Sequence, residues 1–325
     1  MSNPFHLQSH LDHLYVTKPH QLAFRAETLD EFNIWQQTLR ATVREILGIA
    51  GRVLPVSVEP ELLQTIARDG YREEKYALDI GASLGERVIA PMYVLVPNTP
   101  PPYKPVMVFH GHNPSVQYIL GNYPNDEIAA DRRAVDNNYA QALAQAGYLV
   151  CAVEQRGFGE RVSDQVIDNK GEGFASTCRQ LSFDYLMQGK VMIGERVWDG
   201  MVAMTYIQSR PDVVSGAMGV TGNSGGGTTT LWLSALDERV TVMVPSCYFC
   251  SFKHSILGMR HCECNYVPRI LDYAEMGDLA ALFAPRPFRV IAGELDHIFP
   301  LEGVRQQFET VQRAYDLHGA GDRCS

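Results

Sequence analysis

The N-terminal part of the chain carries a helical pattern of hydrophobic positions. Apolar side chains recur at steps of three and four residues, at Phe32, Trp35, Leu39, Val43 and Ile46. Thr28 and Glu31 precede them with the spacing of a capping box, and Gly48 follows them. We therefore predict an amphipathic helix within a helical N-terminal extension, residues 1–70, that packs on the main domain. A partner-binding helix is the less favoured interpretation.

From residue 71 onwards the pattern changes to short apolar runs between turns. Residues 76–80 and 88–96 flank a turn that contains Gly81 and Gly85, and this arrangement predicts a β-hairpin. The run at 106–110 is apolar up to its last residue, as expected of a parallel strand that is buried on both faces.

The remainder of the chain alternates between strand-like and helix-like stretches. Further strand-like runs cover residues 148–153, 218–221, 240–244 and 288–292. Helical stretches lie at 139–146, 191–209 and 301–317, and another follows residue 224. This alternation predicts an α/β fold with a doubly wound, mostly parallel sheet over residues 71–325. Residues 247–285 are expected to form a lid-like insertion in that domain.

Composition narrows the possible partners. A chain of 325 residues with 46% hydrophobic content can bury the core of one α/β domain. The net charge of −9 argues against a nucleic-acid partner, and no segment has the apolar length of a membrane span. An odd number of cysteines, seven, favours reduced thiols and a cytoplasmic location. A homo-oligomer is compatible with this composition, but no feature indicates one.

The most informative stretch is a small-residue turn between a predicted strand and a predicted helix. Residues 222–226, GNSGG, fit the G-x-S-x-G nucleophile elbow, in which glycines let the backbone turn tightly around an exposed serine. We therefore predict Ser224 as the nucleophile. The alternative is a glycine-rich turn without chemistry.

A second candidate feature follows the first buried strand. In the sequence His110-Gly111-His112, the glycine turn would aim the backbone N–H of His112 at the serine. With the N–H of Gly225 this makes a two-donor oxyanion hole. In the alternative interpretation His110 packs beside the strand and Gly111 only turns the chain.

An acidic residue follows the last predicted strand, downstream of the serine. This is where the order Ser, Asp/Glu, His places the residue that orients a catalytic histidine. We favour Asp296, with Glu294 as the alternative. The loop 154–161, EQRGFGER, has two glycines and paired charges. We interpret it as a tight loop held by internal salt bridges.

With these motifs the chain resembles the α/β-hydrolase superfamily, and within it the acetyl-xylan-esterase-like and dienelactone-hydrolase-like bacterial esterases. The resemblance runs from about residue 71 to the end and rests on HGH at 110–112, RGFGER at 156–161, GERVWD at 194–199, the elbow, HCECNY at 261–266, and Asp296 with Phe299-Pro300. It implies hydrolysis of a carboxylic ester by Ser224 through an acyl-enzyme, with Asp296 behind a histidine and with no metal or other cofactor.

The resemblance also implies one more strand, followed by the histidine loop, after the helix at 301–317. Neither is found before Ser325, so we expect the histidine beyond Ser325, in a longer protein. His318 stands at the wrong end of a helix about 25 Å long. His112, His254 and His261 are weaker candidates, and a non-catalytic protein is the remaining alternative.

The lid-like insertion is rich in aromatic residues and cysteines, which suits the wall of an acyl pocket. A zinc site is the alternative interpretation, with ligands drawn from His261, Cys262, Cys264 and either Cys247 or Cys250. Because Cys262 and Cys264 are too close for the usual second ligand pair, we expect buried thiols and no metal.

The sequence thus predicts a serine carboxylesterase acting on a small-molecule ester, with acetyl esters of sugars as the favoured substrates. A peptidase of the same fold is one alternative, although about 70 residues are too few for a propeller domain that would select peptides. A pseudo-hydrolase that binds a ligand or partner is the other.

Overall fold

The structure is a computed structural model that describes residues 5–163 and 175–325. Its centre is a seven-stranded sheet in the order β1-β2-β3-β5-β4-β6-β7. The strands are β1 (Glu61–Arg68), β2 (Tyr71–Asp79), β3 (Ile89–Pro97), β4 (Pro105–Phe109), β5 (Leu149–Val153), β6 (Gly219–Asn223) and β7 (Val242–Ser246). The helices are α1 (Gln8–Thr17), α2 (Leu29–Ile46), α3 (Asp126–Arg133), α4 (Tyr139–Gln145), α5 (Cys178–Met187), α6 (Met192–Ser209), α7 (Gly225–Leu236), α8 (Ile270–Tyr273), α9 (Met276–Ala281) and α10 (Leu301–Leu317).

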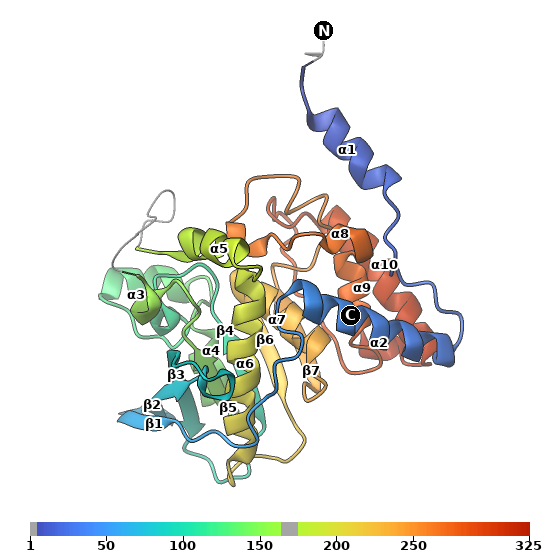
Figure 1. Ribbon diagram of the computed structural model, residues 1–325. Coiled ribbons are helices and arrows are strands. Elements are labelled where there is room, and N and C mark those ends of the chain that lie inside the picture. The colour runs from blue at the N-terminus through green and yellow to red at the C-terminus, as the bar shows by residue number, and fades with distance from the viewer. Residues whose placement is uncertain (1–4, 164–174) are drawn as a thin grey trace.

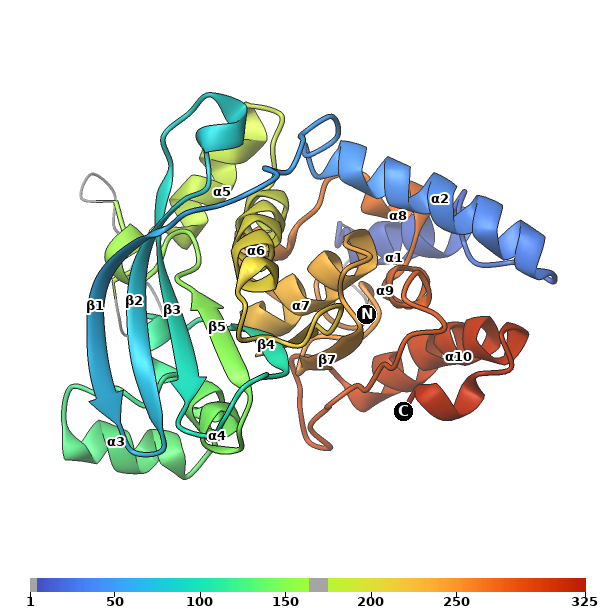
Figure 2. The same cartoon turned by 90° about the horizontal axis from the view of Figure 1, so that it is seen from below.

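The sheet is mixed, which corrects the expectation of a mostly parallel one. The predicted hairpin forms as β2 and β3, but β1–β2, β2–β3 and β3–β5 are all antiparallel pairs. Only β5, β4, β6 and β7 run parallel to one another. Figure 2 shows the antiparallel strands at one side of the molecule and α2 and α10 at the other. The candidate site belongs to the parallel half.

The prediction of helical structure up to residue 70 was wrong for residues 61–68, which form β1. This strand is mostly exposed, so its hydrophobic pattern is weak, and its stability comes from the hydrogen-bonded ladder with β2. The two strands are joined by Asp69 and Gly70, and Gly70 adopts φ 83°. Asp-Gly between two short runs is a strong hairpin signal, and it could have identified β1.

Helices cover both faces of the sheet. On one face, Ala140 and Ala144 of α4 pack against strand residues such as Val108 and Val150. On the other face, α6 and α7 pack on the strands, and α2 covers α7. The capping box of Thr28 and Glu31 is present, and the apolar stripe of α2 is buried in the larger core. This confirms that α2 has a packing role.

The ends of the described chain differ in how they contact the domain. In Figure 1, α1 extends away from the rest of the molecule. The predicted strand at 288–292 lies beside β7 through isolated bridges at Phe288 and Ile291, and Phe288 also bridges to Cys324. No helix among the described residues combines the length and apolarity needed to cross a bilayer.

Candidate active site

Ser224 stands at the sharp turn between β6 and α7. Its backbone has φ 55° and ψ −118°, a conformation that costs a non-glycine residue of order 1–3 kcal/mol. The turn is tight because glycines allow it. A Cβ on Gly222 would lie 2.5 Å from the carbonyl oxygen of Phe109, and a Cβ on Gly226 would overlap the same oxygen. The N–H of Ser224 donates to the carbonyl of Ser246, 2.9 Å away, which ties the turn to β7. This is the geometry of a nucleophile elbow.

The loop after β4 lies directly against this elbow. A Cβ on Gly111 would lie 2.8 Å from the carbonyl oxygen of Asn223, and Nδ1 of His112 lies 3.0 Å from the place of a Cβ on Gly225. Among the described residues, neither the N–H of His112 nor that of Gly225 donates a hydrogen bond. The structure therefore places the loop that carries His112 against Gly225, next to Ser224, and the role of the two N–H groups as oxyanion donors stays a prediction.

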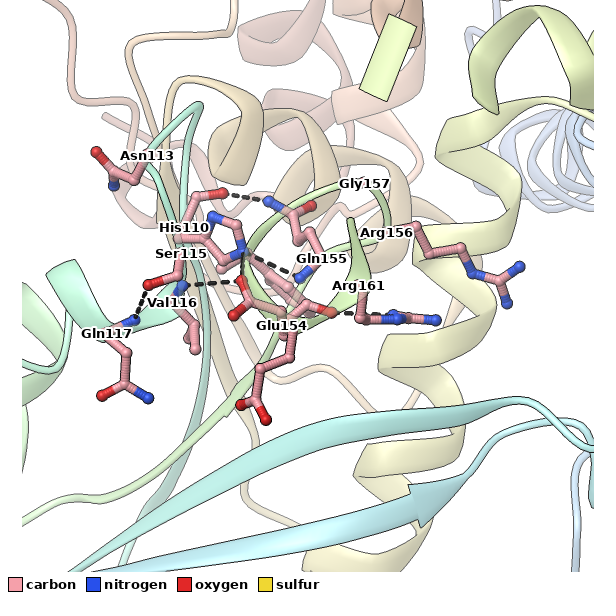
Figure 3. Close-up of polar contacts among 12 residues, drawn as sticks. His110, Asn113, Ser115, Val116, Gln117, Glu154, Gln155, Arg156, Gly157 and Arg161 are labelled. Carbon is pink, nitrogen blue, oxygen red and sulfur yellow. Dashed lines mark hydrogen bonds and ion pairs between the residues drawn. The ribbon is translucent and has the colours of Figure 1, made fainter. Parts of the chain in front are cut away.

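His110 has a structural environment. Its ring is fully buried, and Nδ1 lies 2.8 Å from the carbonyl oxygen of Gly111. The N–H of Gln155 donates to Nε2 over 3.0 Å, and the amide of Gln155 donates to the His110 carbonyl. Glu154 is also close to the ring and accepts from the N–H of Val116 (Figure 3). These contacts join the loops after β4 and β5, so His110 fixes the loop that carries His112.

The loop after β5 is held by ion pairs. The prediction placed these pairs within the loop, but the carboxylates that pair with its arginines lie on α6. Arg156 pairs with Asp199 at 2.6 Å and with Glu195 at 2.8 Å, both on α6. Arg161 also pairs with Asp199, at 2.7 Å. Burial alone would raise the pKa of Asp199, but the two arginines outweigh burial and lower it below its ordinary value. The prediction of a structural loop fits this arrangement, and the GERVWD motif supplies the carboxylates.

Asp296 lies in the loop that follows the chain segment beside β7. Its Oδ1 accepts hydrogen bonds from the N–H groups of Ile298, at 2.8 Å, and Phe299, at 3.1 Å. No histidine among the described residues donates to it, so the acid role of Asp296 stays a prediction. Glu294, the alternative, is exposed to solvent.

None of the histidines in the described residues forms a hydrogen bond with the hydroxyl of Ser224. His318 packs edge-on against Phe32 of α2. His254 contacts the hydroxyl of Ser251. His261 contacts the hydroxyl of Ser255 at 3.0 Å. Burial lowers the pKa of His261, and Asp296 is near enough to oppose that shift.

The imidazole of His112 faces a cluster of cysteines. Cys178 of α5 and Cys262 and Cys264 of the insertion place their sulfur atoms around its Nε2, and these four ligand atoms all lie within 4.8 Å of one another. Sequence reasoning did not select Cys178, and it paired Cys262 and Cys264 with other residues. Only the fold brings these segments together.

Comparison with known proteins now assigns the family. A model of the Abhydrolase family matches residues 10–325. The chain belongs to this family of α/β-hydrolases. The match confirms the resemblance that the elbow, the HGH turn and the acid loop carried. It also covers most of the N-terminal extension, in which the sequence alone showed no family motif.

Relatives and solved structures agree with this assignment. "Putative hydrolase YtaP" of Bacillus subtilis (strain 168) is 29% identical over 289 residues, which are 87% of this chain and 89% of that protein. A solved "putative acetyl xylan esterase" from Bacteroides fragilis NCTC 9343 has a TM-score of 0.79 at 19% identity, covering 99% of this chain and 82% of its own. A glucuronoyl esterase from Solibacter usitatus has a TM-score of 0.66 at 15% identity, covering 93% and 86%. These structures show a shared fold.

Proposed function

We propose that this α/β-hydrolase is a serine carboxylic-ester hydrolase that acts through an acyl-enzyme on small acetyl-type esters, with sugar acetates as the favoured substrates. The observation that carries the proposal is the elbow of Ser224, whose backbone is strained and lies next to the N–H groups of Gly225 and the HGH loop, neither of which donates a hydrogen bond within the described residues. Strain of this kind is retained where it serves a function. The esterases among the structural neighbours lend support at the level of the fold.

The reaction follows from this geometry. The oxygen of Ser224 attacks the ester carbonyl, and the charge that develops on the carbonyl oxygen is stabilised by the N–H groups of His112 and Gly225. The carbon–oxygen bond to the alcohol then breaks, and water releases the acid from the acyl-enzyme. A histidine, oriented by Asp296, takes the serine proton and passes it to the leaving alcohol. Each oxyanion donor contributes roughly 3 kcal/mol to such a transition state.

The test is covalent labelling of the full-length protein with a fluorophosphonate, followed by intact mass measurement. We expect a single adduct in the wild type and none in Ser224→Ala. Ser234→Ala is the matched control. Ser234 lies in α7, the helix that follows Ser224, and its buried hydroxyl has no hydrogen-bond partner. Hydrolysis of p-nitrophenyl acetate and of an acetylated sugar should follow the same order.

Two results would contradict the proposal. An adduct that persists in folded Ser224→Ala would move the nucleophile to another residue. A folded full-length protein that forms no adduct and hydrolyses no ester would favour a ligand-binding protein instead. That alternative has one observation behind it: within the described residues, no histidine forms a hydrogen bond with the hydroxyl of Ser224.

A further inference from the structure

Three thiols and one imidazole from three separate parts of the fold converge beside the elbow. Cys178 is the first residue of α5, and Cys262 and Cys264 lie on either side of Glu263 in the insertion. His112 follows β4. The Sγ atoms of Cys178 and Cys262 are 3.5 Å apart, and Sγ of Cys264 is 3.6 Å from Nε2 of His112. All seven cysteines of the chain are free thiols in the structure.

These separations match the edges of a zinc coordination tetrahedron. With Zn–S bonds of about 2.3 Å and Zn–N bonds of about 2.0–2.1 Å, two sulfur ligands stand about 3.8 Å apart, and a sulfur and a nitrogen about 3.6 Å apart. The largest separation in the cluster, up to 4.8 Å, needs a closure of about 1 Å to reach this geometry. A set of three thiolates and one imidazole is also a ligand combination found in structural zinc sites.

A buried arginine supplies an independent observation. Arg196 is only 2% exposed, and its Nη2 lies 3.1 Å from Sγ of Cys178. Its Nε has no hydrogen-bond partner, and within residues 5–163 and 175–325 no carboxylate forms an ion pair with it. A buried cation without a counter-charge is costly, so the sulfur cluster is expected to be anionic.

We propose that Cys178, Cys262, Cys264 and Nε2 of His112 bind one zinc ion in a closed, four-coordinate structural site. One Zn²⁺ replaces the protons of three thiols, which are released to solvent, while the imidazole binds in its neutral form. The resulting centre carries a net charge of −1, which the guanidinium of Arg196 balances. This replaces our expectation that the chain binds no metal. The ligand set differs from the one considered in the sequence, because His112 and Cys178 take the places given to His261 and to Cys247 or Cys250.

The site would join three segments that have no backbone connection near it: the loop after β4, the start of α5 and the lid-like insertion. Because His112 also offers its backbone N–H beside Ser224, zinc would hold that N–H in place relative to the N–H of Gly225. The proposal does not depend on esterase activity, since its evidence is the ligand geometry and the charge of Arg196.

Metal content of the full chain tests the proposal. We expect the protein, purified without chelator and dialysed against metal-free buffer, to retain one zinc ion per chain by plasma mass spectrometry. Cys178→Ser and Cys262→Ser should lose it, whereas Cys324→Ser, which removes a buried thiol near the C-terminal end, should retain it. Circular dichroism checks that each variant is folded.

A measurement on the wild type covers the case in which the ligand variants do not fold. Exchange of the metal for Co²⁺ should give thiolate-to-cobalt charge-transfer absorption and the intense visible bands of a tetrahedral site. The proposal is overturned if the reduced wild type takes up neither zinc nor cobalt, or if both folded cysteine variants retain zinc. Isolation of the native protein with Cys178 and Cys262 in a disulfide would overturn it as well.

Discussion

Two buried carboxyl groups make the stability of this protein depend on pH. Glu275 is 5% exposed and accepts hydrogen bonds from the hydroxyl of Tyr15, at 2.6 Å, and from the backbone N–H groups of Phe252 and Met276. Glu275 is the N-cap residue of α9, and Asp278 in the first turn of that helix completes the capping box. Burial, reinforced by the neighbouring carboxylate, raises the pKa of Glu275 from 4.5 to about 7, although the hydrogen bonds oppose the shift. Burial also raises the pKa of Asp278, to about 6.

The sign follows from linkage. Consider a carboxyl group whose pKa is higher in the folded state than in the unfolded state. Its full contribution to stability is present while the group is protonated in both the folded and the unfolded state. That contribution is lost as the pH rises through the folded pKa. Glu275→Gln cannot ionise, so the free energy of unfolding of the wild type should fall relative to the variant by about 2 kcal/mol between pH 5 and pH 8.

Urea denaturation of the wild type and of Glu275→Gln at pH 5, 6, 7 and 8 measures this difference. The amide keeps the shape of the protonated acid, so the variant isolates the ionisation from the packing. Glu59→Gln, which removes an exposed carboxyl, is the control and should leave the pH profile of the wild type unchanged. A difference between wild type and Glu275→Gln that stays constant or grows with pH would refute the reasoning.

Two further substitutions test the framework around the elbow. Gly226→Ala should prevent the native turn, because its Cβ would overlap the carbonyl oxygen of Phe109; we expect loss of soluble, folded protein, and a normal melting temperature would contradict the packing described here. Arg156→Met should lower the free energy of unfolding by about 3 kcal/mol at neutral pH, because it leaves Asp199 buried with one arginine fewer. Its denaturation midpoint in urea at pH 7 measures this, and an effect below about 1 kcal/mol would show that Arg161 alone suffices.

Features that depend on neighbouring residues were predictable from the sequence. The elbow needs only a strand, three small residues around a serine and a helix, and all of these are contiguous in the chain. The capping box of Thr28 and Glu31 is likewise local. The acid role of Asp296 rests on chain order after the serine and stays a prediction. Local patterns of this kind predict the folded structure correctly, because the interactions that produce them lie within one turn or one helix.

Features that depend on distant pairings were not predictable in the same way. β3 pairs antiparallel with β5, and nothing in either run of apolar residues specifies that direction, so the sheet was expected to be mostly parallel. The cysteine cluster is a stronger case. Its members lie on three separate segments. The sequence pointed to Cys262 and Cys264 with Cys247 or Cys250, and nothing in it pointed to Cys178. Side-chain clusters that the tertiary fold assembles from distant segments leave no spacing pattern in the sequence.

The charged residues of α6 show how a buried helix can indicate a charged side-chain cluster nearby. Nearly the whole helix is buried, so each of its charged residues needs a counter-charge from the surrounding fold. Glu195 and Asp199 obtain theirs from arginines of other segments. Arg196, between them in sequence, donates from Nη2 to the carbonyl of Arg156 and lies 3.1 Å from the sulfur of Cys178, but among the described residues it forms no ion pair with a carboxylate. A buried helix with one cation that no carboxylate balances therefore predicts an anionic centre, and the thiol cluster is the group placed to provide it.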